Sequence, residues 1–416
     1  MSEKKHHVLI IGTVWPEPGS SAAGSRMIQL IQLFRSRDWD VIFASSATES
    51  EYSIHLELFQ VKKAQIELNS ASFDRFIHSV QPSVVLFDRF MTEEQYGWRV
   101  AEQCPDAIRI LDTEDLHCLR KSREAAWKEG REFLAEDLLS SEVAIRELAS
   151  IFRCDLSLII SEFEMSLLTD LFRVDESLLI YTPFQFNGIS DSAFSELPAF
   201  EERDHFITIG NFLHEPNRNS VKWLKEEIWP LIRKELPEAK IHNYGAYPSK
   251  KVQQLHNERE GFLIHGRADS AGRVIKQAKV LLAPLRFGAG LKGKLTDAMR
   301  YGTPSVTTSI GAEGLNGNLP WPGFIADSAK EIASTAVKLY QNKSVWHQAQ
   351  EKGRDIINRR FSADTHRRVL NGRIDAILSD LKHHRESNFI GSMLMHHHHA
   401  STKYMSRWIE EKNRPK

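Results

Sequence analysis

The chain contains 416 residues, with 54 basic and 55 acidic side chains and a formal net charge of -1. This length predicts two domains, and 41% hydrophobic with 26% charged residues is ordinary for a globular protein. The balanced charge lacks the excess of basic residues that is typical of nucleic-acid-binding proteins. It does not exclude a local basic patch that binds a membrane.

The cysteines and the apolar runs indicate in which cellular compartment the protein is expected. Cys104, Cys118 and Cys154 cannot all pair, and their spacing is not that of a metal site, which favours a reduced cytosolic setting. The first apolar run leads into a glycine loop, which is typical of a first strand rather than of a signal peptide. Since no apolar run is long enough to span a bilayer, we expect a cytoplasmic protein.

Strand-length apolar runs alternate with helical periodicity through the first half of the chain. Helices are expected around residues 27–34 and 94–103, whereas strands are expected at residues 8–11, 41–44, 84–87, 108–111, 156–160 and 178–181. This alternation predicts a parallel α/β domain.

The connection after the first strand, residues 12–25, is long and contains Gly12, Gly19 and Gly24. Long loops at the carboxyl ends of parallel strands are common ligand sites, although a mobile surface loop would have the same composition. The glycine spacing is not a dinucleotide fingerprint.

Two polar segments follow strands in this half. Residues 112–117, DTEDLH, resemble a metal site in composition, but a helix N-terminus capped by Asp112 or Thr113 explains them as well. In the second segment, SEFEMSLL, Ser161 and Glu164 have the spacing of a capping box, for which we expect no catalytic role.

The second half repeats the α/β pattern after an irregular linker at residues 187–205. Residues 206–209 and 262–266 predict strands, and residues 328–340, 344–359 and a long segment ending near residue 384 predict helices. Beyond Ser387 the sequence indicates a polar tail with a histidine run at residues 396–399.

The most informative stretch is residues 283–308, APLRFGAGLKGKLTDAMRYGTPSVTT. It predicts a strand, a glycine loop, a helix beginning near Gly293 and a further strand. Backbone N–H groups of the loop, the positive end of the helix, Lys292 and Lys294 would form an anion pocket. Asp297 lies about one turn further along the same helix face, where it could accept bonds from sugar hydroxyls.

This stretch resembles the donor-binding motif of GT-B glycosyltransferases of retaining family four, the group 1 glycosyl transferases. The resemblance assigns the diphosphate to Lys292 and Lys294, backbone contacts to the loop at Gly288, Ala289, Gly290 and Leu291, and the ribose to Asp297. Two positions depart from the family pattern: Asp297 replaces a glutamate, and Ala289 stands where many members carry a second acid.

Other segments fit the same family less closely. The resemblance implies that His117 lies near the transferred sugar, that the loop with Gly12, Gly19 and Gly24 faces the acceptor and the donor phosphates, and that His265 lies near the nucleobase. Asn211 occupies a donor-loop position where the family often has arginine.

The resemblance implies a GT-B fold, in which two Rossmann-like, doubly wound α/β domains face a cleft and a C-terminal helix crosses back to the first domain. We accordingly expect an acceptor domain at residues 1–186, a linker at 187–205, a donor domain at 206–360, a crossing helix at 361–386 and a tail at 387–416.

The function implied is metal-independent, hexosyltransferase-like transfer of a sugar with retention, from a nucleotide sugar to a saccharide, lipid-linked or other acceptor in cell-surface glycan synthesis. The family needs no cofactor besides this donor substrate, and neither a metal nor nucleic acid is expected as a partner. The resemblance is compatible with peripheral contact at the inner face of the membrane. A non-catalytic GT-B protein that binds a nucleotide or a partner is the alternative.

Overall fold

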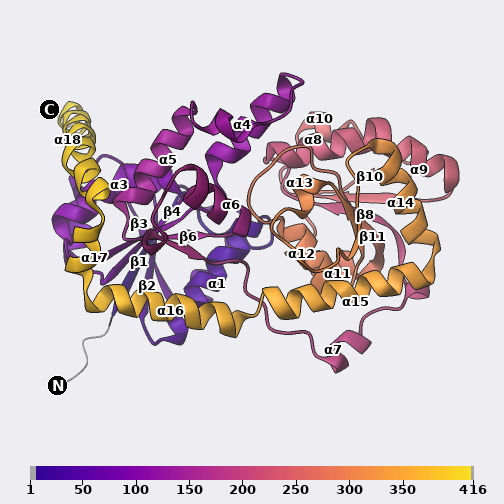
Figure 1. The fold of residues 1–416 in the computed structure, drawn as a ribbon, viewed down its shortest axis with the longest axis horizontal. Coiled ribbons are helices and arrows are strands. Elements are labelled where there is room, and N and C mark those ends of the chain that lie inside the picture. The colour runs from indigo at the N-terminus through magenta and orange to yellow at the C-terminus, as the bar shows by residue number, and fades with distance from the viewer. Residues whose placement is uncertain (1–5, 414–416) are drawn as a thin grey trace.

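The chain folds into two α/β domains that lie side by side along the long axis of the molecule (Figure 1). The computed structural model describes residues 6–413, and for residues 397–400 it describes the backbone only. Each domain is built on one parallel sheet with helices on both faces, which confirms the two Rossmann-like domains expected from the sequence.

The first sheet has seven strands in the order β3-β2-β1-β4-β5-β6-β7, and every pair in it is parallel. Its strand order reverses at β1, between β2 and β4, and such a reversal opens a crevice at the carboxyl edge of a parallel sheet. The strands are β1 (His7–Gly12), β2 (Asp40–Ser45), β3 (Val61–Gln65), β4 (Val84–Asp88), β5 (Ile108–Asp112), β6 (Leu156–Ile159) and β7 (Leu179–Tyr181).

The second sheet has six strands in the order β10-β9-β8-β11-β12-β13, again all parallel, and reverses at β8. Both crevices open toward the space between the domains. The strands are β8 (Asp204–Ile209), β9 (Ile241–Tyr244), β10 (Phe262–Ile264), β11 (Ala278–Ala283), β12 (Ser305–Thr307) and β13 (Gly323–Ile325).

Helices connect the strands and cover the sheets. In the first domain they are α1 (Ala22–Ser36), α2 (Ala71–Val80), α3 (Phe90–Gln103), α4 (His117–Lys128), α5 (Glu142–Arg153) and α6 (Glu162–Ser166), and α7 (Asp191–Ser195) lies in the linker. In the second domain they are α8 (Glu215–Trp223), α9 (Trp229–Glu235), α10 (Lys250–Gln253), α11 (Ala271–Gln277), α12 (Gly293–Arg300), α13 (Ser309–Ala312), α14 (Ala329–Gln341) and α15 (Lys343–Arg360).

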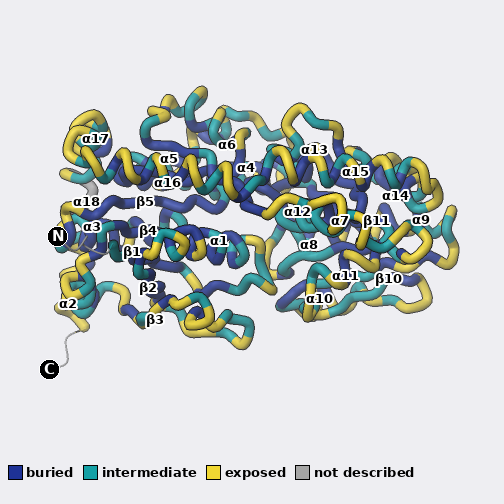
Figure 2. Tube along the Cα trace, turned by 90° about the horizontal axis from the view of Figure 1, so that it is seen from below, coloured by how far each residue is buried: buried dark blue, intermediate teal, exposed yellow. Residues whose placement is uncertain are grey.

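Burial follows the layers. Strands β4 and β5 of the first sheet are buried along their whole length, as the dark blue β5 in Figure 2 shows, because helices cover both faces of the sheet. Strands buried in this way read as continuous apolar runs rather than as alternating ones, which is why VLII and VVLF were recognisable as strands in the sequence.

The chain returns to the first domain after α15. Helix α16 (Ala363–Ser379) packs Leu370, Ile374 and Ile377 into the core beneath β1 and β4. At the crossing the two connections between the domains pair with each other: the Phe186 amide donates to Phe361 O at 2.8 Å, and the Ala363 amide donates to Phe186 O at 2.9 Å.

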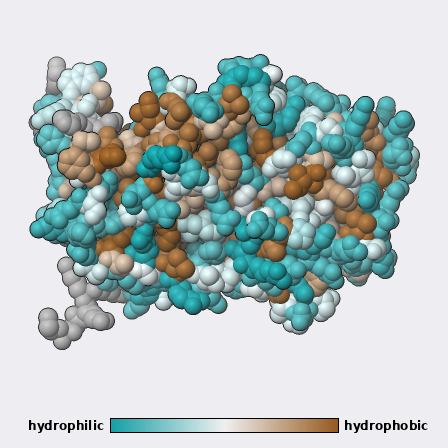
Figure 3. Space-filling view, viewed as in Figure 1, coloured by the Kyte–Doolittle hydropathy of each residue, from teal (hydrophilic) through white to brown (hydrophobic). Residues whose placement is uncertain are grey.

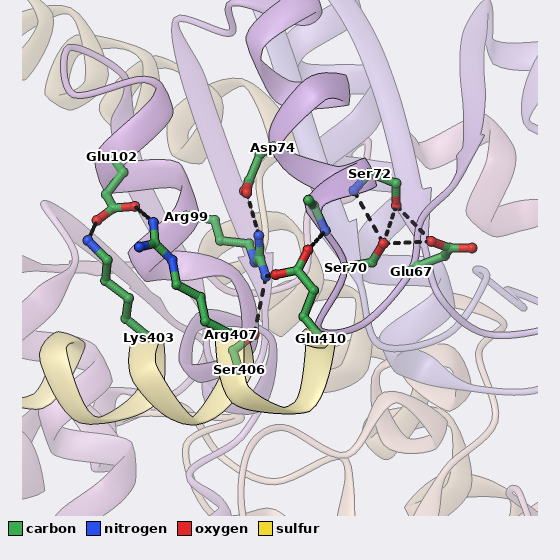
Figure 4. Close-up of polar contacts among 11 residues, drawn as sticks. Glu67, Ser70, Ser72, Asp74, Arg99, Glu102, Lys403, Ser406, Arg407 and Glu410 are labelled. Atoms are coloured by element: carbon green, nitrogen blue, oxygen red, sulfur yellow. Dashed lines mark hydrogen bonds and ion pairs between the residues drawn. The ribbon is translucent and has the colours of Figure 1, made fainter. Parts of the chain in front are cut away.

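The segment expected as a tail forms α17 (Leu381–Ser387) and the long helix α18 (Phe389–Lys412), which packs on α3 and α5. Figure 4 shows the polar contacts that hold its C-terminal half. Arg99 is buried and donates to Asp74 Oδ2 at 2.5 Å and to Ser406 Oγ at 3.2 Å, and it lies 3.5 Å from Glu410 Oε2. These long-range contacts are absent from any local sequence pattern, so the helix was missed. The side chains of three of the four histidines at 396–399 lie outside the described residues.

Apolar side chains are exposed on the first domain beside α5. Figure 3 shows hydrophobic surface gathered over this part of the molecule. Leu139, Ile145 and Phe389 are 57%, 66% and 72% exposed, and Asn388, next to Phe389, bonds Phe152 O near the end of α5. Within residues 6–413, no helix combines the length and the apolar character needed to cross a membrane.

Removing Arg99 should loosen α18. We expect Arg99→Ala to reduce the free energy of unfolding by about 2 kcal/mol, because the substitution leaves the partly buried carboxylates of Asp74 and Glu410 without their shared cation. Chemical denaturation measures this loss. Arg407→Ala is the matched control. The Arg407 side chain is 56% exposed and makes a long ion pair, 3.7 Å, with Glu102, so its removal should reduce the free energy of unfolding by about 0.5 kcal/mol or less. Equal losses in the two variants would contradict this account of the docking.

Candidate active site

A cavity of about 680 Å³ lies between the two domains, at the carboxyl ends of both sheets. The first domain contributes the loops after β1, β4 and β5, and the second contributes the loops after β8, β9, β10 and β11. This volume is in the range of sites that enclose small organic ligands. Both strand-order reversals therefore open on the same cavity.

The centre of the second domain's wall is the glycine loop, residues 286–291, which joins β11 to α12. Gly290 has a φ of 63°, and a Cβ at this position would lie 2.8 Å from Asp115 Cβ in the first domain. A side chain there would be strained and would separate the domains, so glycine is required. Leu291 also lines the cavity, and its buried side chain packs in an apolar cluster that includes Ile160 and Phe184 of the first domain.

Two lysines flank the start of α12. Lys292 is 8% exposed, and its Nζ donates to Gly290 O at 2.8 Å. Lys294 Nζ donates to Asn217 Oδ1 at 2.7 Å and lies against Gly210, where a Cβ would be 2.8 Å from it. Burial lowers the pKa of both lysines to about 8. Two buried ammonium groups beside a helix N-terminus form a strong site for a polyanion.

His117 lines the opposite wall, at the start of α4. Its Nε2 lies 3.4 Å from Asp115 Oδ1, and its ring meets Phe90 edge-on at 5.6 Å. Burial lowers the pKa of His117 to about 4, and the neighbouring Asp115 charge opposes this effect without overcoming it. At neutral pH the imidazole is therefore uncharged and can exchange hydrogen bonds with a sugar hydroxyl.

His214 faces the same aspartate from the second domain. It lines the cavity at the start of α8, and burial lowers its pKa to about 4. Arg120 completes the group by donating to Asp115 Oδ2 at 2.7 Å, which helps to hold the pKa of Asp115 below its usual range.

Asp297 and Ala289 line the cavity. Asp297 Oδ1 accepts a bond from Arg300 at 3.1 Å, while its side chain remains about a third exposed, so one carboxylate oxygen is available to a ligand. Ala289, at the position of the missing acid, packs against the apolar core of the first domain. A charged residue at 289 would be buried in that contact.

Asn211 lines the cavity but serves the turn after β8, because its Oδ1 accepts the Leu213 amide at 2.8 Å. His265 is not among the cavity-lining residues. It stacks on Tyr244 at 4.6 Å between ring centres, and its Nε2 lies 3.1 Å from His242 Nδ1. The residue two positions on, Arg267, does line the cavity.

The loop after β1 lies between the domains. Gly19 and Gly24 line the cavity, whereas Gly12 does not and lies behind the ring of Phe43, which does. Arg267 of the second domain approaches the backbone at Gly19. The neighbouring Glu17 accepts two contacts from Tyr247 Oη, at 3.0 and 3.1 Å.

Two local predictions are wrong. The cap of α4 is not Asp112 or Thr113: the helix begins at His117, and the Glu147 carboxylate of α5 accepts its first amides, His117 N and Cys118 N, each at 2.9 Å. Ser161 and Glu164 do not form a capping box, because Ser161 makes no side-chain cap bond and Glu164 turns inward. In both cases a tertiary partner replaces the local one.

Arg89 and Glu114 were missed. Both line the cavity at the carboxyl ends of β4 and β5, with left-handed φ values of 70° and 60°. Burial and the nearby Asp112 raise the pKa of Glu114, and its Oε1 has no hydrogen-bond partner among the described residues. This geometry suits a carboxyl group that awaits a ligand hydroxyl. The described residues contain no cluster of His, Cys, Asp and Glu able to hold a metal ion.

Residues 203–342 match the family of glycosyl transferases group 1. The second domain is a group 1 glycosyl transferase domain. The match covers the glycine loop, both lysines and Asp297, but not the first domain. An uncharacterised 44.6 kDa protein from the cps region of Klebsiella pneumoniae is 29% identical over 119 residues, which span 27% of this chain and 31% of that protein.

Solved structures resemble the whole chain. Sucrose-phosphate synthase from Thermosynechococcus elongatus has a TM-score of 0.69 at 13% identity, covering 90% of this chain and 100% of that one. HepE from Anabaena, in complex with UDP and glucose, has a TM-score of 0.63 at 12% identity, covering 88% and 99%. With the two facing domains and the crossing helix, these likenesses show that the fold is GT-B.

Anion binding should weaken at high pH. The two buried lysines lose their protons as the pH rises through about 8, so the Kd for a nucleoside diphosphate should increase by up to about tenfold per pH unit for each lysine that titrates. Isothermal titration calorimetry with UDP and GDP between pH 6.5 and 9.5 measures this. An affinity that is constant across this range would show that the lysines do not provide the charge.

Proposed function

We propose that the chain is a retaining glycosyltransferase that moves a sugar from a nucleotide-sugar donor to a saccharide or lipid-linked acceptor in glycan synthesis. The observation that carries this proposal is the pair of buried lysines beside the glycine loop and the start of α12, facing a cavity between two domains. The group 1 match of the second domain supports a nucleotide-sugar donor.

In the proposed reaction the bond between the anomeric carbon and the donor phosphate breaks, and a bond from an acceptor hydroxyl oxygen forms on the same face. The acceptor proton passes to the departing phosphate oxygen, so no protein nucleophile is needed. Negative charge grows on the diphosphate as the bond breaks, and Lys292 and Lys294 stabilise it where it develops. The pKa values of both lysines would rise toward their usual range once the diphosphate is bound.

Asp297 would hold the ribose through its second carboxylate oxygen, and Arg267 and Tyr247, which also line the cavity, are candidates for contact with the base. His117, which is uncharged near neutral pH, would bond a hydroxyl of the transferred sugar without repelling the adjacent cationic groups. Contacts between both domains and the ligand would exclude the water that competes with the acceptor.

A nucleotide-binding protein without transferase activity is the second candidate. The apolar packing of Ala289 and the turn-forming role of Asn211 favour it, because both positions lack the charge that the family pattern often carries there. Hydrolysis or transfer from a bound nucleotide sugar separates the two candidates. Binding without turnover over a broad acceptor screen would support the binding protein.

Lys294 provides the decisive test. A nucleoside diphosphate that binds the folded wild-type protein raises its melting temperature, and a screen of UDP, GDP and their sugar-loaded forms would identify it. We expect Lys294→Ala to raise the Kd of that ligand about tenfold to a hundredfold, the cost of losing a buried charge-assisted bond. The exposed Lys330→Ala is the control. If Lys294→Ala binds as tightly as this control, the phosphate role is lost.

Contact of the first domain with a membrane is part of the proposal, because the exposed apolar side chains beside α5 would suit a lipid surface that carries the acceptor. We expect wild-type protein to sediment with phosphatidylglycerol-containing vesicles and Ile145→Glu to sediment at least about fivefold less, since a charge is expelled from the apolar interface. Leu58→Glu, at a site that is 77% exposed and away from α5, is the control. Equal sedimentation of both variants would contradict this surface.

A further inference from the structure

The glycine loop of the second domain is hydrogen-bonded from the first domain. Glu164 of α6 is fully buried, and its Oε1 accepts two backbone amides: Gly290 N of the glycine loop at 2.9 Å and Leu116 N, just before α4, at 3.0 Å. A single carboxyl oxygen thus joins the two walls of the cavity. Glu164 itself does not line the cavity, so it acts through the two segments that do.

Arg123 of α4 bonds the other end of the same loop. Its guanidinium donates to Gly288 O at 2.9 Å and to both carboxylate oxygens of Glu313, at 2.8 and 2.7 Å. Phe133 and Phe163 flank this guanidinium at 5.3 and 5.2 Å, which fixes its plane. The loop is therefore bonded at Gly288 and at Gly290, in each case by a buried side chain of the other domain.

Apolar contacts extend this attachment. Trp127 of α4 packs on Phe287 at 5.2 Å between ring centres and lies under the Arg286 guanidinium at 4.7 Å. Ala289 packs into the first domain's core. Five successive residues of the loop, 286–290, thus meet the first domain, and the loop's bonds to its own domain come mainly from its ends.

The charges around Glu164 explain why a carboxyl group is tolerated beside a phosphate site. Burial raises the pKa of Glu164 to about 8, and the negative charge of Asp115 adds to this, while the two backbone amides and Lys292 oppose it. Arg26 of α1 and Cys118 of α4 also face it. Near neutral pH Glu164 keeps its proton, so it can accept two amides without repelling a bound diphosphate.

We propose that Glu164 and Arg123 are positioning residues that form an interdomain clamp, which gives the glycine loop its binding conformation only while the two domains are in contact. The clamp rests on the proposed function, since it regulates the same phosphate site. Domain contact and nucleotide binding are then coupled: each strengthens the other by the same factor.

Amide exchange tests the clamp without any ligand. In Glu164→Ala, the Gly290 and Leu116 amides lose their acceptor, and hydrogen exchange in peptides covering residues 288–291 and 114–118 should accelerate about tenfold or more in both. Glu164→Gln keeps an acceptor oxygen and mimics the neutral acid, so its exchange should stay within about threefold of wild type. Asp170→Asn, an exposed site just after α6, is the control.

Nucleotide binding separates a clamp from general stability. For the nucleoside diphosphate identified in the screen, Glu164→Ala should raise the Kd about tenfold to a hundredfold, and Glu164→Gln should restore it. If wild-type protein binds no nucleotide, the proposed function fails, while the exchange measurement still decides the clamp. If Glu164→Ala does not fold, Arg123→Met breaks the other end of the clamp, and faster exchange at residues 288–291 is expected there.

The pH dependence adds a readout that packing alone would not change. Between about pH 4.5 and 8 the folded chain holds a proton on Glu164 that the unfolded chain releases, so wild-type stability falls as the pH rises through this window. Glu164→Gln should remove that part of the slope. The clamp is overturned if exchange at residues 288–291 is unchanged in folded Glu164→Ala, or if Glu164→Gln loses nucleotide binding as fully as Glu164→Ala.

Discussion

The buried backbone of the glycine loop must have hydrogen-bond partners, and much of the structure is arranged to supply them. A buried amide or carbonyl without a partner costs about as much as a lost hydrogen bond. Residues 286–291 belong to neither a helix nor a strand, so these partners cannot come from regular secondary structure. Arg123 and Glu164 supply these bonds from the first domain, at Gly288 and Gly290. The glycine loop of the second domain thus depends on contact with the first domain for the hydrogen bonds of its backbone.

The same region concentrates charge away from water. Lys292 is buried and Lys294 is half-buried, and the hydrogen bonds of their ammonium groups go to a carbonyl and an amide oxygen rather than to carboxylates. Burial without a carboxylate partner lowers the pKa of each lysine. Keeping these charged groups away from water therefore reduces the stability of the folded protein. A bound diphosphate would recover this free energy. The positive charge of the two lysines, which lacks a carboxylate partner, would therefore both destabilise the empty site and favour the binding of a polyanion.

The sequence predicted the features that depend on local order. Continuous apolar runs identified the parallel strands, and the spacing of the lysines after a glycine loop predicted their place at the start of α12, because a strand, a loop and a helix start are encoded by neighbouring residues. It failed where a distant residue competes with a local one. Glu164 has the spacing of a capping box but bonds Gly290, which is far along the chain. Helix α18 was missed because its anchor, Arg99, lies in α3. At position 289 the family pattern suggested a missing acid, whereas the structure shows a half-buried alanine that packs against the core of the first domain.

The paired connections at Phe186 and Phe361 also determine how the molecule can move. Within residues 6–413, the segments before and after the second domain both lie in the first domain, and the two connections between the domains bond to each other. A double tether of this kind permits bending about one axis and resists twisting, whereas a single linker would allow both. Any opening of the cavity would then be mainly a bending at this pair of connections, and on closing the glycine loop would meet the same residues of α4 and α6 again.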